Sequence, residues 1–405
     1  MKPNTKWLLV CLCSALFLSG CTCLDRKTTH EIKIKAEAGD AEAQFRIGWM
    51  YYKGLGVKQD TAKAVEWYRK AANQNFAAAQ HNLGVAYRDG EGVTKDADEA
   101  VKHWLSAADQ GHSDAQTSVG WSYYSGEGVT KDAAKAVKWW SKAAVQGNAW
   151  AQSWLGVAYR DGVGVEKDSV EAAKWVRKSA EQGFAWAQIN LAAAYRDGDG
   201  VPKDATEAVR WYRLAALQGQ PDAQTSLGVR YYTGEGVAKD AAEAVKWYRK
   251  AAELGHAVAQ NNLGVAYQDG QGIRKNASES AKWYRRAADQ GHADAQSSLG
   301  WMYYIGEGVT KNTSEAVAWY RKAVDQGNAY AQHNLGVAYR DGQGVPKDLV
   351  EAYAWLNLAS ATFAPAATLR AQLEKTMTAP QVADAQKRTK ELQAQIQAKK
   401  TTGGN

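Results

Sequence analysis

The amino-acid sequence predicts an all-α fold, a right-handed α/α superhelical solenoid made of nine consecutive 36-residue repeats. The first observation is that the dipeptide Ala-Gln recurs every 36 residues without an insertion or deletion. The second is that a tyrosine follows each of these glutamines by seven residues. The third is that a Gly-x-Gly pair follows each tyrosine. The Ala-Gln pairs begin at residues 43, 79, 115, 151, 187, 223, 259, 295 and 331.

Each repeat divides into two helices, because its apolar residues recur at helical spacing in two separate stretches. In the first helix of the second repeat, Ala79, Leu83 and Tyr87 are four residues apart. Gly84 on the same helix leaves room for a neighbouring backbone. In the second helix, Trp104 lies on the equivalent apolar stripe. One such hairpin cannot bury its stripes alone, so consecutive repeats are expected to stack.

The boundaries of the two helices follow from capping signals. Gly-x-Gly is expected to end the first helix, because glycine adopts positive φ at low cost. The second helix should begin at an Asp or Asn whose side chain accepts from free backbone N–H groups, at Asp60, Asp96, Asp132, Asp168, Asp204, Asp240, Asn276, Asn312 and Asp348. In seven repeats a Glu three residues later predicts a capping box, at Glu99, Glu171, Glu207, Glu243, Glu279, Glu315 and Glu351. Lys63 and Lys135 take that place in the other two repeats.

A tryptophan follows the second glycine by eleven residues in eight of the repeats. These residues are Trp67, Trp139, Trp175, Trp211, Trp247, Trp283, Trp319 and Trp355. The second repeat has His103 at this position, and we expect the neighbouring Trp104 to take over the role.

The N-terminal residues 1–20 have the features of a lipoprotein signal peptide. Lys2 and Lys6 precede an apolar stretch over 7–18, which is shorter than the roughly 20 residues needed to span a bilayer. The sequence 18–21, Leu-Ser-Gly-Cys, resembles a bacterial lipobox, which implies cleavage before Cys21 and its acylation, palmitate included. Because Thr22 follows rather than Asp, the resemblance implies the outer membrane, on its periplasmic side or on the cell surface. An ordinary signal peptide with an incidental cysteine is the alternative.

Composition limits the classes of function. The four cysteines lie at 11, 13, 21 and 23, so signal removal and acylation would leave only Cys23 free, and no disulfide or thiolate metal site is expected. The formal net charge of +7 is a mild excess over 405 residues without long runs of Lys or Arg. This pattern argues against a nucleic-acid partner.

The repeat unit resembles a known family. Its Ala-x-Ala-Gln, Leu-Gly, Tyr, Gly-x-Gly-Val, Lys-Asp, Ala-Val-x-Trp-Tyr and Lys-Ala-Ala motifs are similar, in this order, to the Sel1-like repeat, a relative of the tetratricopeptide repeat. Ala192, which replaces the first-helix glycine in the fifth repeat, and His103 are the departures. The resemblance implies a protein- or peptide-binding scaffold or adaptor in the cell envelope. It implies no enzyme activity, no cofactor, no metal and no small-molecule substrate.

Three other functions stay open at this point. One is a surface-exposed lipoprotein that binds a host factor, and another is a scaffold that binds glycan or peptidoglycan. The third is a weak β-lactamase-like hydrolase, an activity reported for the Helicobacter cysteine-rich proteins within the family. Those relatives pin each helix pair with a disulfide that this chain cannot form, so the hydrolase is not expected to carry over. The expected partner is therefore a protein or extended peptide, in the envelope or on a host cell, with a lipid anchor in the membrane.

The chain is expected to be organised around the repeats. Residues 21–29 form the acylated N-terminus and a linker, 30–42 a partial N-terminal repeat, and 43–364 the nine repeats. Residues 365–399 are expected to form C-terminal capping helices, because a solenoid needs its terminal core faces covered, and 400–405 a disordered tail. A segment that binds a partner is the alternative for the C-terminal helices.

The candidate partner-binding groove lies on the side of the first helices that the recurring residues leave free. In this superfamily the first helices line the concave face, and the residues there are of types enriched at interface hot spots. The candidates are Phe45, Trp49, Tyr52, His81, Arg88, Trp121, Tyr124, Arg160, Arg196, Tyr232, Trp301, Tyr304, His333 and Arg340, with Asn82, Asn190, Asn262 and Asn334 beside them. Alternatively, the tryptophans pack between repeats and each Arg pairs with the Asp that follows it.

The sequence offers little support for catalysis or metal binding. Gly-x-Gly follows a helix, lacks a Walker lysine and repeats nine times, so we interpret it as a turn and not a phosphate loop. The seven histidines form no His-Glu-x-x-His motif, and three of them, His112, His256 and His292, follow a glycine between repeats, as surface residues or residues near an N-cap. The outward side of the second helices carries Lys or Arg, mostly three residues after a Glu, which indicates a solvated face.

Overall fold

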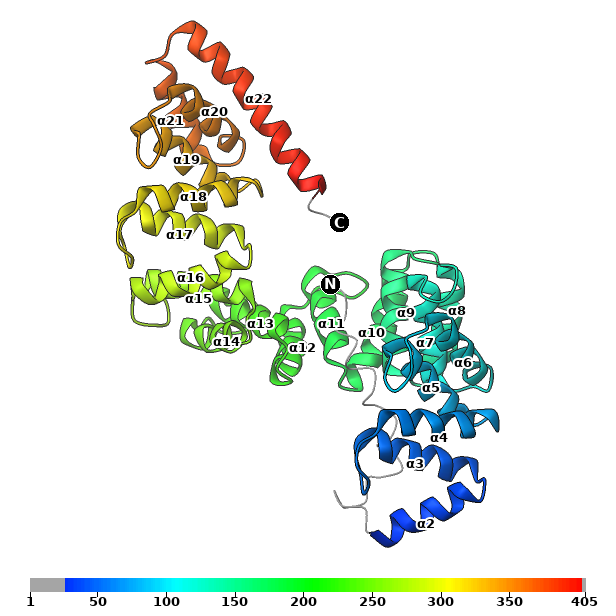
Figure 1. Ribbon diagram of the computed structural model, residues 1–405. Coiled ribbons are helices and arrows are strands. Elements are labelled where there is room, and N and C mark those ends of the chain that lie inside the picture. The colour runs from blue at the N-terminus through cyan, green and yellow to red at the C-terminus, as the bar shows by residue number, and fades with distance from the viewer. Residues whose placement is uncertain (1–25, 403–405) are drawn as a thin grey trace. The chain divides into compact units, whose positions relative to one another are not determined.

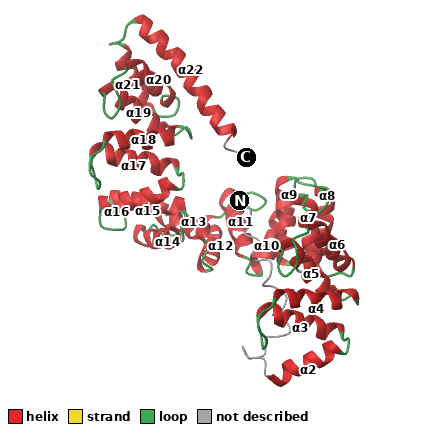
Figure 2. Cartoon of the chain, in the orientation of Figure 1, coloured by secondary structure: helices red, strands yellow, loops and turns green. Residues whose placement is uncertain are grey.

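The computed structural model describes residues 26–402, which form 21 helices and contain no strand (Figures 1 and 2). The signal peptide 1–20, the lipobox with Cys21 and the last three residues lie outside the described range. Among residues 26–402, none of the helices has the length and apolar character needed to cross a membrane.

The nine repeats are nine helical hairpins, as the spacing predicts. In the eight repeats other than the fifth, the two helices pack on one another. Within each of the two units, the second helix of a repeat packs on the first helix of the next repeat. The first helices are α3 (Ala41–Lys53), α5 (Ala77–Asp89), α7 (Ser113–Ser125), α9 (Ala149–Asp161), α11 (Ala185–Asp197), α13 (Pro221–Thr233), α15 (Ala257–Asp269), α17 (Ala293–Ile305) and α19 (Ala329–Asp341). The second helices are α4 (Thr61–Asn73), α6 (Ala97–Asp109), α8 (Ala133–Val145), α10 (Ser169–Glu181), α12 (Ala205–Leu217), α14 (Ala241–Glu253), α16 (Ala277–Asp289), α18 (Thr313–Val324) and α20 (Leu349–Ala359).

The chain divides into two compact units. The first unit runs through Ala187 and includes 199–201, and the second consists of 188–198 and everything from Pro202 onward. The division falls within the fifth repeat, where Ala192 replaces the first-helix glycine.

The helix ends confirm the capping glycines and the N-cap residues. The first glycine of each described pair ends its helix in the left-handed region, with φ between 67° and 82°. At the start of every second helix the Asp or Asn side chain accepts from the N–H three residues on, at 2.9 to 3.1 Å.

The predicted capping box is only half correct. In all nine repeats the N–H of the N-cap residue donates to the carbonyl of the recurring tyrosine, at 2.8 to 2.9 Å, as Asp96 does to Tyr87. The glutamate is therefore not needed there. It pairs instead with the Lys or Arg three residues later, as Glu99 does with Lys102 at 2.6 Å. In α18 and α20 that basic residue is an alanine, and the glutamate accepts from a tryptophan indole, Trp319 or Trp355, instead.

The apolar clusters lie between consecutive repeats. One cluster joins Val65 and Tyr68 of α4 to Leu83 of α5, with the side chains of α3 packed against it. The position after the recurring tryptophan is buried in every second helix, with Trp104 3% exposed and Trp140 1% exposed. Trp104 therefore does not take over from His103. His103 keeps the tryptophan position, half-buried, and stacks on Tyr87 with ring centroids 5.6 Å apart.

Two sets of glycines set how closely the elements approach. A Cβ at Gly84 would lie 2.5 Å from the Trp104 ring, so the first-helix glycine allows the hairpin to close. A Cβ at Gly92, the second glycine of its pair, would lie 2.2 Å from the carbonyl oxygen of Thr61 in the preceding repeat. A glycine is thus required at this position for two reasons, the close contact between repeats and the positive φ of 74°.

A ladder of glutamine pairs also joins the two helices within a repeat. The glutamine of each Ala-Gln pair accepts from a glutamine amide 30 residues later, at 2.6 to 2.9 Å, in seven repeats. The ladder is broken where Leu254 replaces the donor. There the buried Oε1 of Gln224 has no hydrogen-bond partner, and Leu254 is 61% exposed.

We expect Leu254→Gln to stabilise the second unit by about 1 kcal/mol, because a buried acceptor without a partner costs roughly 1–3 kcal/mol. Thermal unfolding and amide exchange of α13 to α15 would measure the gain. Leu217→Gln is the matched control, since Leu217 is 68% exposed but occupies no ladder position. Equal effects of the two substitutions would show that the ladder contributes nothing.

The ends of the repeat array are covered by helices, as predicted. At the N-terminus α2 (Arg26–Glu37) packs on α3 and buries Ala36. At the C-terminus α21 (Ala364–Glu374) and α22 (Ala379–Thr402) both pack on α20. Because α22 continues to Thr402, residues 400–402 are helical and do not belong to the predicted disordered tail.

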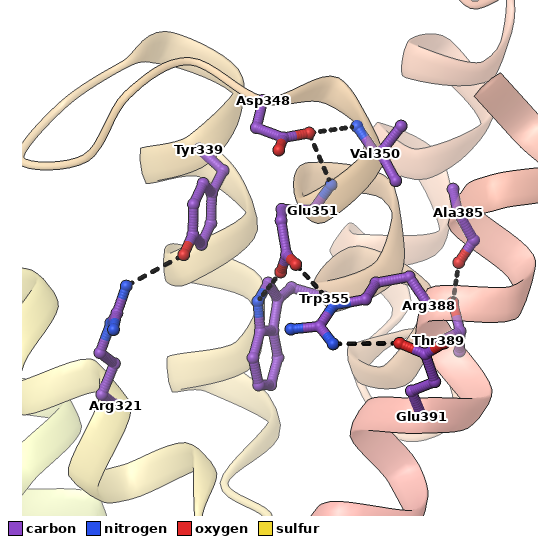
Figure 3. Close-up of polar contacts among 10 residues, drawn as sticks. All are labelled: Arg321, Tyr339, Asp348, Val350, Glu351, Trp355, Ala385, Arg388, Thr389 and Glu391. Atoms are coloured by element: carbon purple, nitrogen blue, oxygen red, sulfur yellow. Dashed lines mark hydrogen bonds and ion pairs between the residues drawn. The ribbon is translucent and has the colours of Figure 1, made fainter.

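The contact of α22 with α20 combines an ion pair with an apolar seam (Figure 3). Arg388 Nε donates to Glu351 at 2.5 Å, and the same carboxylate accepts from the Trp355 indole. Leu392 is 3% exposed within the cluster that contains Trp355. At position 354, where six earlier repeats have an outward Lys or Arg, an alanine is fully buried, whereas Ala318 at the same position of the preceding repeat is exposed. The last repeat is thus adapted in sequence to carry a cap.

Candidate interaction surface

The residues of the predicted groove differ in how much surface they offer. His81 and Arg88 are buried, 6% and 8% exposed, so they present little to a partner. The other predicted residues are half-buried: Phe45, Trp49, Tyr52, Trp121, Tyr124, Arg160, Arg196, Tyr232, Trp301, Tyr304, His333 and Arg340. Of the asparagines beside them, Asn334 is buried and its Nδ2 has no hydrogen-bond partner.

The arginines of the groove pair with the aspartate that follows them. Arg88, Arg160, Arg196 and Arg340 each donate two hydrogen bonds to the next residue, at 2.6 to 2.9 Å. Side-chain hydrogen bonding to Arg160 correspondingly lowers the pKa of Asp161. The positive charge of these guanidinium groups is largely neutralised within the chain. They are therefore less suited to bind an acidic partner.

Several aromatic residues of the groove pack against a neighbouring ring. Phe45 contacts Tyr68 and Phe76, with ring centroids 5.8 and 5.4 Å apart. Trp301 stacks on Tyr304 at 5.9 Å. The alternative interpretation was that the tryptophans pack between repeats, and Trp121 does so, because its ring centroid lies 4.9 Å from that of Trp154 in the next repeat.

The largest aromatic cluster lies in the first unit, on α7, α8, α9 and the start of α11. Trp154 is at its centre, with ring centroids 4.9 Å from Trp121, 5.8 Å from Trp140 and 5.3 Å from Trp186. Trp150 contacts Phe184 at 4.5 Å, and Phe184 contacts Trp186. We call Trp121, Tyr124, Trp140, Trp150, Trp154, Phe184 and Trp186 the aromatic cluster.

Four members of the aromatic cluster were missed from the sequence, namely Trp150, Trp154, Phe184 and Trp186. Trp154 occupies the repeat position of Asn82 and Asn190, and Trp186 occupies that of Ala78. Comparing the repeats position by position for departures from their own pattern would have found them. Trp186 is 37% exposed, whereas Trp140 beneath is 1% exposed.

A stacked histidine pair is buried beside this face. The His81 and His112 ring centroids are 5.0 Å apart, and the buried Nδ1 of His81 has no hydrogen-bond partner. Burial, with smaller contributions from His112 and Arg88, lowers the pKa of His81 to about 3. Burial also lowers the pKa of His112.

Acid should therefore destabilise the second and third repeats. The folded state disfavours protonation of His81, so stability is complete above the ordinary pKa of 6.5 and is lost as pH falls from 6.5 toward 3. At pH 5 the loss is about 2 kcal/mol, since one unit of pKa shift corresponds to about 1.4 kcal/mol. Unfolding at pH 7 and pH 5 would measure it. His81→Ser, which copies Ser153 and Ser297 in other repeats, should reduce the pH dependence, and an unchanged profile would contradict the assignment to His81.

The histidines between repeats are N-cap residues themselves. The Nδ1 atoms of His112, His256 and His292 each accept from the backbone N–H three residues on, at 3.3 Å. Asn148 does the same for α9, and its Nδ2 donates to Asp114 at 2.6 Å. Burial raises the pKa of Asp114 to about 6.

One of these caps resembles a hydroxyl–histidine–carboxylate arrangement. His256 Nδ1 lies 2.9 Å from the Thr225 hydroxyl, and its Nε2 lies 2.9 Å from Asp222. The Thr225 hydroxyl is also 2.8 Å from the Pro221 carbonyl, and His256 Nδ1 accepts from Ala259. Because Asn148 bridges its cap to Asp114 in the same way, we interpret the His256 group as a helix cap. Among residues 26–402, no three His, Cys, Asp or Glu side chains are grouped as metal ligands.

Comparison with known proteins agrees with this architecture. The Sel1 repeat family model matches residues 41–76, 77–112, 113–148, 151–184, 187–220, 221–256, 257–292, 293–328 and 329–361. The structure of a protective antigen of uropathogenic Escherichia coli is similar over 91% of this chain and 95% of that one, with 34% identity and a TM-score of 0.54. A Sel1 repeat protein from Oxalobacter formigenes is similar over 76% and 88%, with 35% identity and a TM-score of 0.57.

A curated relative with a described partner matches over a shorter stretch. The secretory immunoglobulin A-binding protein EsiB of Escherichia coli O6:H1 is 39% identical over 67 residues, which are 16% of this chain and 14% of that protein. The chain thus matches less than a fifth of the length of its curated relatives. The family itself is shown by nine consecutive matches and by solved structures that share the fold. This chain therefore belongs to the Sel1 repeat family.

Proposed function

We propose that the chain is a scaffold of the bacterial cell envelope that binds a protein or an extended peptide through its first helices. The observation that carries the proposal is the aromatic cluster on α7, α9 and α11. Its outer rings exceed what packing between repeats requires, because seven of the other repeats have Asn or Ser at the position of Trp154, and most of the others have Glu, Ala or Asp at the position of Trp150 and Trp186. Trp and Tyr are enriched where binding energy concentrates in protein interfaces.

Photo-crosslinking tests whether the first helices form the binding face. A photoreactive phenylalanine at Tyr52, Tyr124 or Tyr232 would sit on the first helices, where these half-buried rings leave space for a planar side chain. The matched controls are Lys102, Lys174 and Lys246 on the second helices, whose side chains are 63–69% exposed and paired with a glutamate. We expect a common partner from the first-helix positions in living cells. Partners captured only from the lysine positions would contradict the proposed face.

The proposed location rests on the lipobox and is tested separately. Cys21→Ser should move the protein from the membrane fraction to the soluble fraction of cells, because the acyl chains supply the anchor. Retention of Cys21→Ser protein in the membrane would contradict acylation at this residue as the anchor. Accessibility of the wild-type protein to protease on intact cells separates a surface location, as a host-factor-binding protein requires, from a periplasmic one.

A further inference from the structure

The exposed part of the aromatic cluster lies at the turns between repeats. Trp150 opens α9, Phe184 precedes α11, and Trp186 is 37% exposed. Val145, at the end of α8, is 73% exposed in the turn that leads to Trp150. We call Trp150, Trp154, Phe184 and Trp186 the outer aromatic surface.

The turns at this surface and the turn before them carry acidic side chains and no basic ones. The turn with Trp150 and Trp154 is uncharged, the turn with Phe184 and Trp186 contains Glu181, and the preceding turn contains Asp109 and Asp114. Residues 109–118, 145–154 and 181–187 contain no Lys or Arg. The full chain has a formal net charge of +7. The negative charge is therefore local to the turns beside the aromatic rings.

One of the carboxylates is fixed beside the rings. Asp114 on α7 accepts at Oδ1 from Asn148, the N-cap of α9, two residues before Trp150. Among the residues that the structure describes, no group donates a hydrogen bond to its other oxygen, Oδ2, and no basic side chain lowers its pKa. A carboxylate oxygen at the edge of the surface is thus available to a donor from outside.

On the second helices, the recurring tryptophan is often covered by the Lys or Arg three residues later. Lys142 lies over the Trp139 ring at 4.0 Å, and Lys178 over Trp175 at 4.1 Å. Lys70, Lys250, Arg286 and Lys322 repeat the arrangement on their own helices. Among the described residues, no cation lies over Trp150 or Trp154. A cation over the outward side of either ring would therefore have to come from a partner.

We propose that the outer aromatic surface binds a Lys- or Arg-containing segment of a partner protein, whose cations stack on the tryptophans and pair with the acidic turns. The inference rests on the proposed protein-binding function and specifies the chemistry of its partner. A polyanion would be repelled by the carboxylates. An uncharged sugar could stack on the rings and donate hydroxyl hydrogen bonds to the carboxylates, but it would form no ion pair with them, so its binding would not weaken with salt.

The binding test uses the whole mature chain with Cys21→Ser and three labelled hexapeptides. Each peptide alternates Leu with Arg, Gln or Glu, and fluorescence anisotropy gives the affinities at low and high salt. We expect the Arg peptide to bind at least about tenfold more tightly than the Gln peptide, and its affinity to fall with salt. Equal binding of the three peptides would overturn the proposal.

Two variants locate the site. Trp150→Ala with Trp186→Ala should weaken the Arg peptide about tenfold, and Asp109→Asn with Glu181→Gln should reduce mainly its salt dependence. Trp139→Ala is the control, because that ring lies on a second helix under Lys142. Circular dichroism and thermal unfolding verify the fold of each variant. Trp186→Lys is a second test, because it places a positive charge at the site that should repel the cation of the peptide. An unchanged affinity in the folded variants would overturn the proposal.

Other outcomes separate this inference from the proposed function. Binding of soluble glycan-strand fragments that depends on Trp150 and Trp186 would assign the surface to sugars and contradict the cationic partner. Partners crosslinked at Tyr124 whose capture is unaffected by the tryptophan variants would support the protein-binding function and contradict this site.

Discussion

Replacing Gly92 with alanine should destabilise the junction of the first two repeats by about 3 kcal/mol or more. The residue has φ of +74°, where an alanine costs roughly 1–2 kcal/mol. A Cβ would also lie 2.2 Å from the Thr61 carbonyl oxygen and 2.4 Å from its carbon, which are backbone atoms that cannot rotate away. Overpacking of this kind adds typically 1–3 kcal/mol.

Gly111→Ala separates the two causes. Gly111 has φ of +89°, but a Cβ there would meet nothing within 4 Å, so only the backbone strain remains. Because repeat proteins unfold through nearest-neighbour junctions, the loss should appear as amide exchange in α3 to α6 before it affects the whole chain. Equal destabilisation by the two substitutions would contradict the close approach of the repeats at Gly92.

Trp140→Ala should cost about 3–5 kcal/mol, the usual range for removal of a buried aromatic side chain. Trp140 is 1% exposed, its indole donates to the Thr117 carbonyl at 3.3 Å, and its ring lies over Gly120. The substitution should also loosen Trp154, whose ring centroid is 5.8 Å from that of Trp140. Both denaturant unfolding and binding at the outer aromatic surface would register the change.

Trp139→Ala is the matched control for stability. The Trp139 side chain is half-buried, on the outward side of α8, and Lys142 covers it. Trp139→Ala should lower the free energy of unfolding clearly less than Trp140→Ala, although the two residues are adjacent and chemically identical. If Trp139→Ala proved the more destabilising, the assignment of the buried stripe to the Trp104 position would be wrong.

The sequence was sufficient for features that depend on local or periodic information. The helical hairpins, the glycine ends, the Asp and Asn caps and the buried stripe through Trp104 were all predicted correctly. Each of these depends on neighbours within a few residues, or on a pattern that nine copies repeat, so chance similarity is excluded.

The errors concern polar groups that have more than one available partner. Glu99 could reach its own N-cap N–H or Lys102, and the choice fell to Lys102 because the Tyr87 carbonyl already satisfies the N–H of Asp96. His103 was expected to yield its role to Trp104, but a one-residue shift on a helix turns a side chain by about 100°. Trp104 therefore belongs to the buried face and His103 to the outer one.

What the sequence determined by itself is the repeated hairpin, because its helices are specified by spacing and caps within 36 residues. Only the tertiary structure decided which side chains of different repeats meet. The contacts of Trp154 with Trp121 and Trp186 join residues more than 30 positions apart, in the repeats before and after its own. Such contacts arise only when rigid helices stack at fixed distances, so the outer aromatic surface is a property of the stacked repeats and not of any one of them.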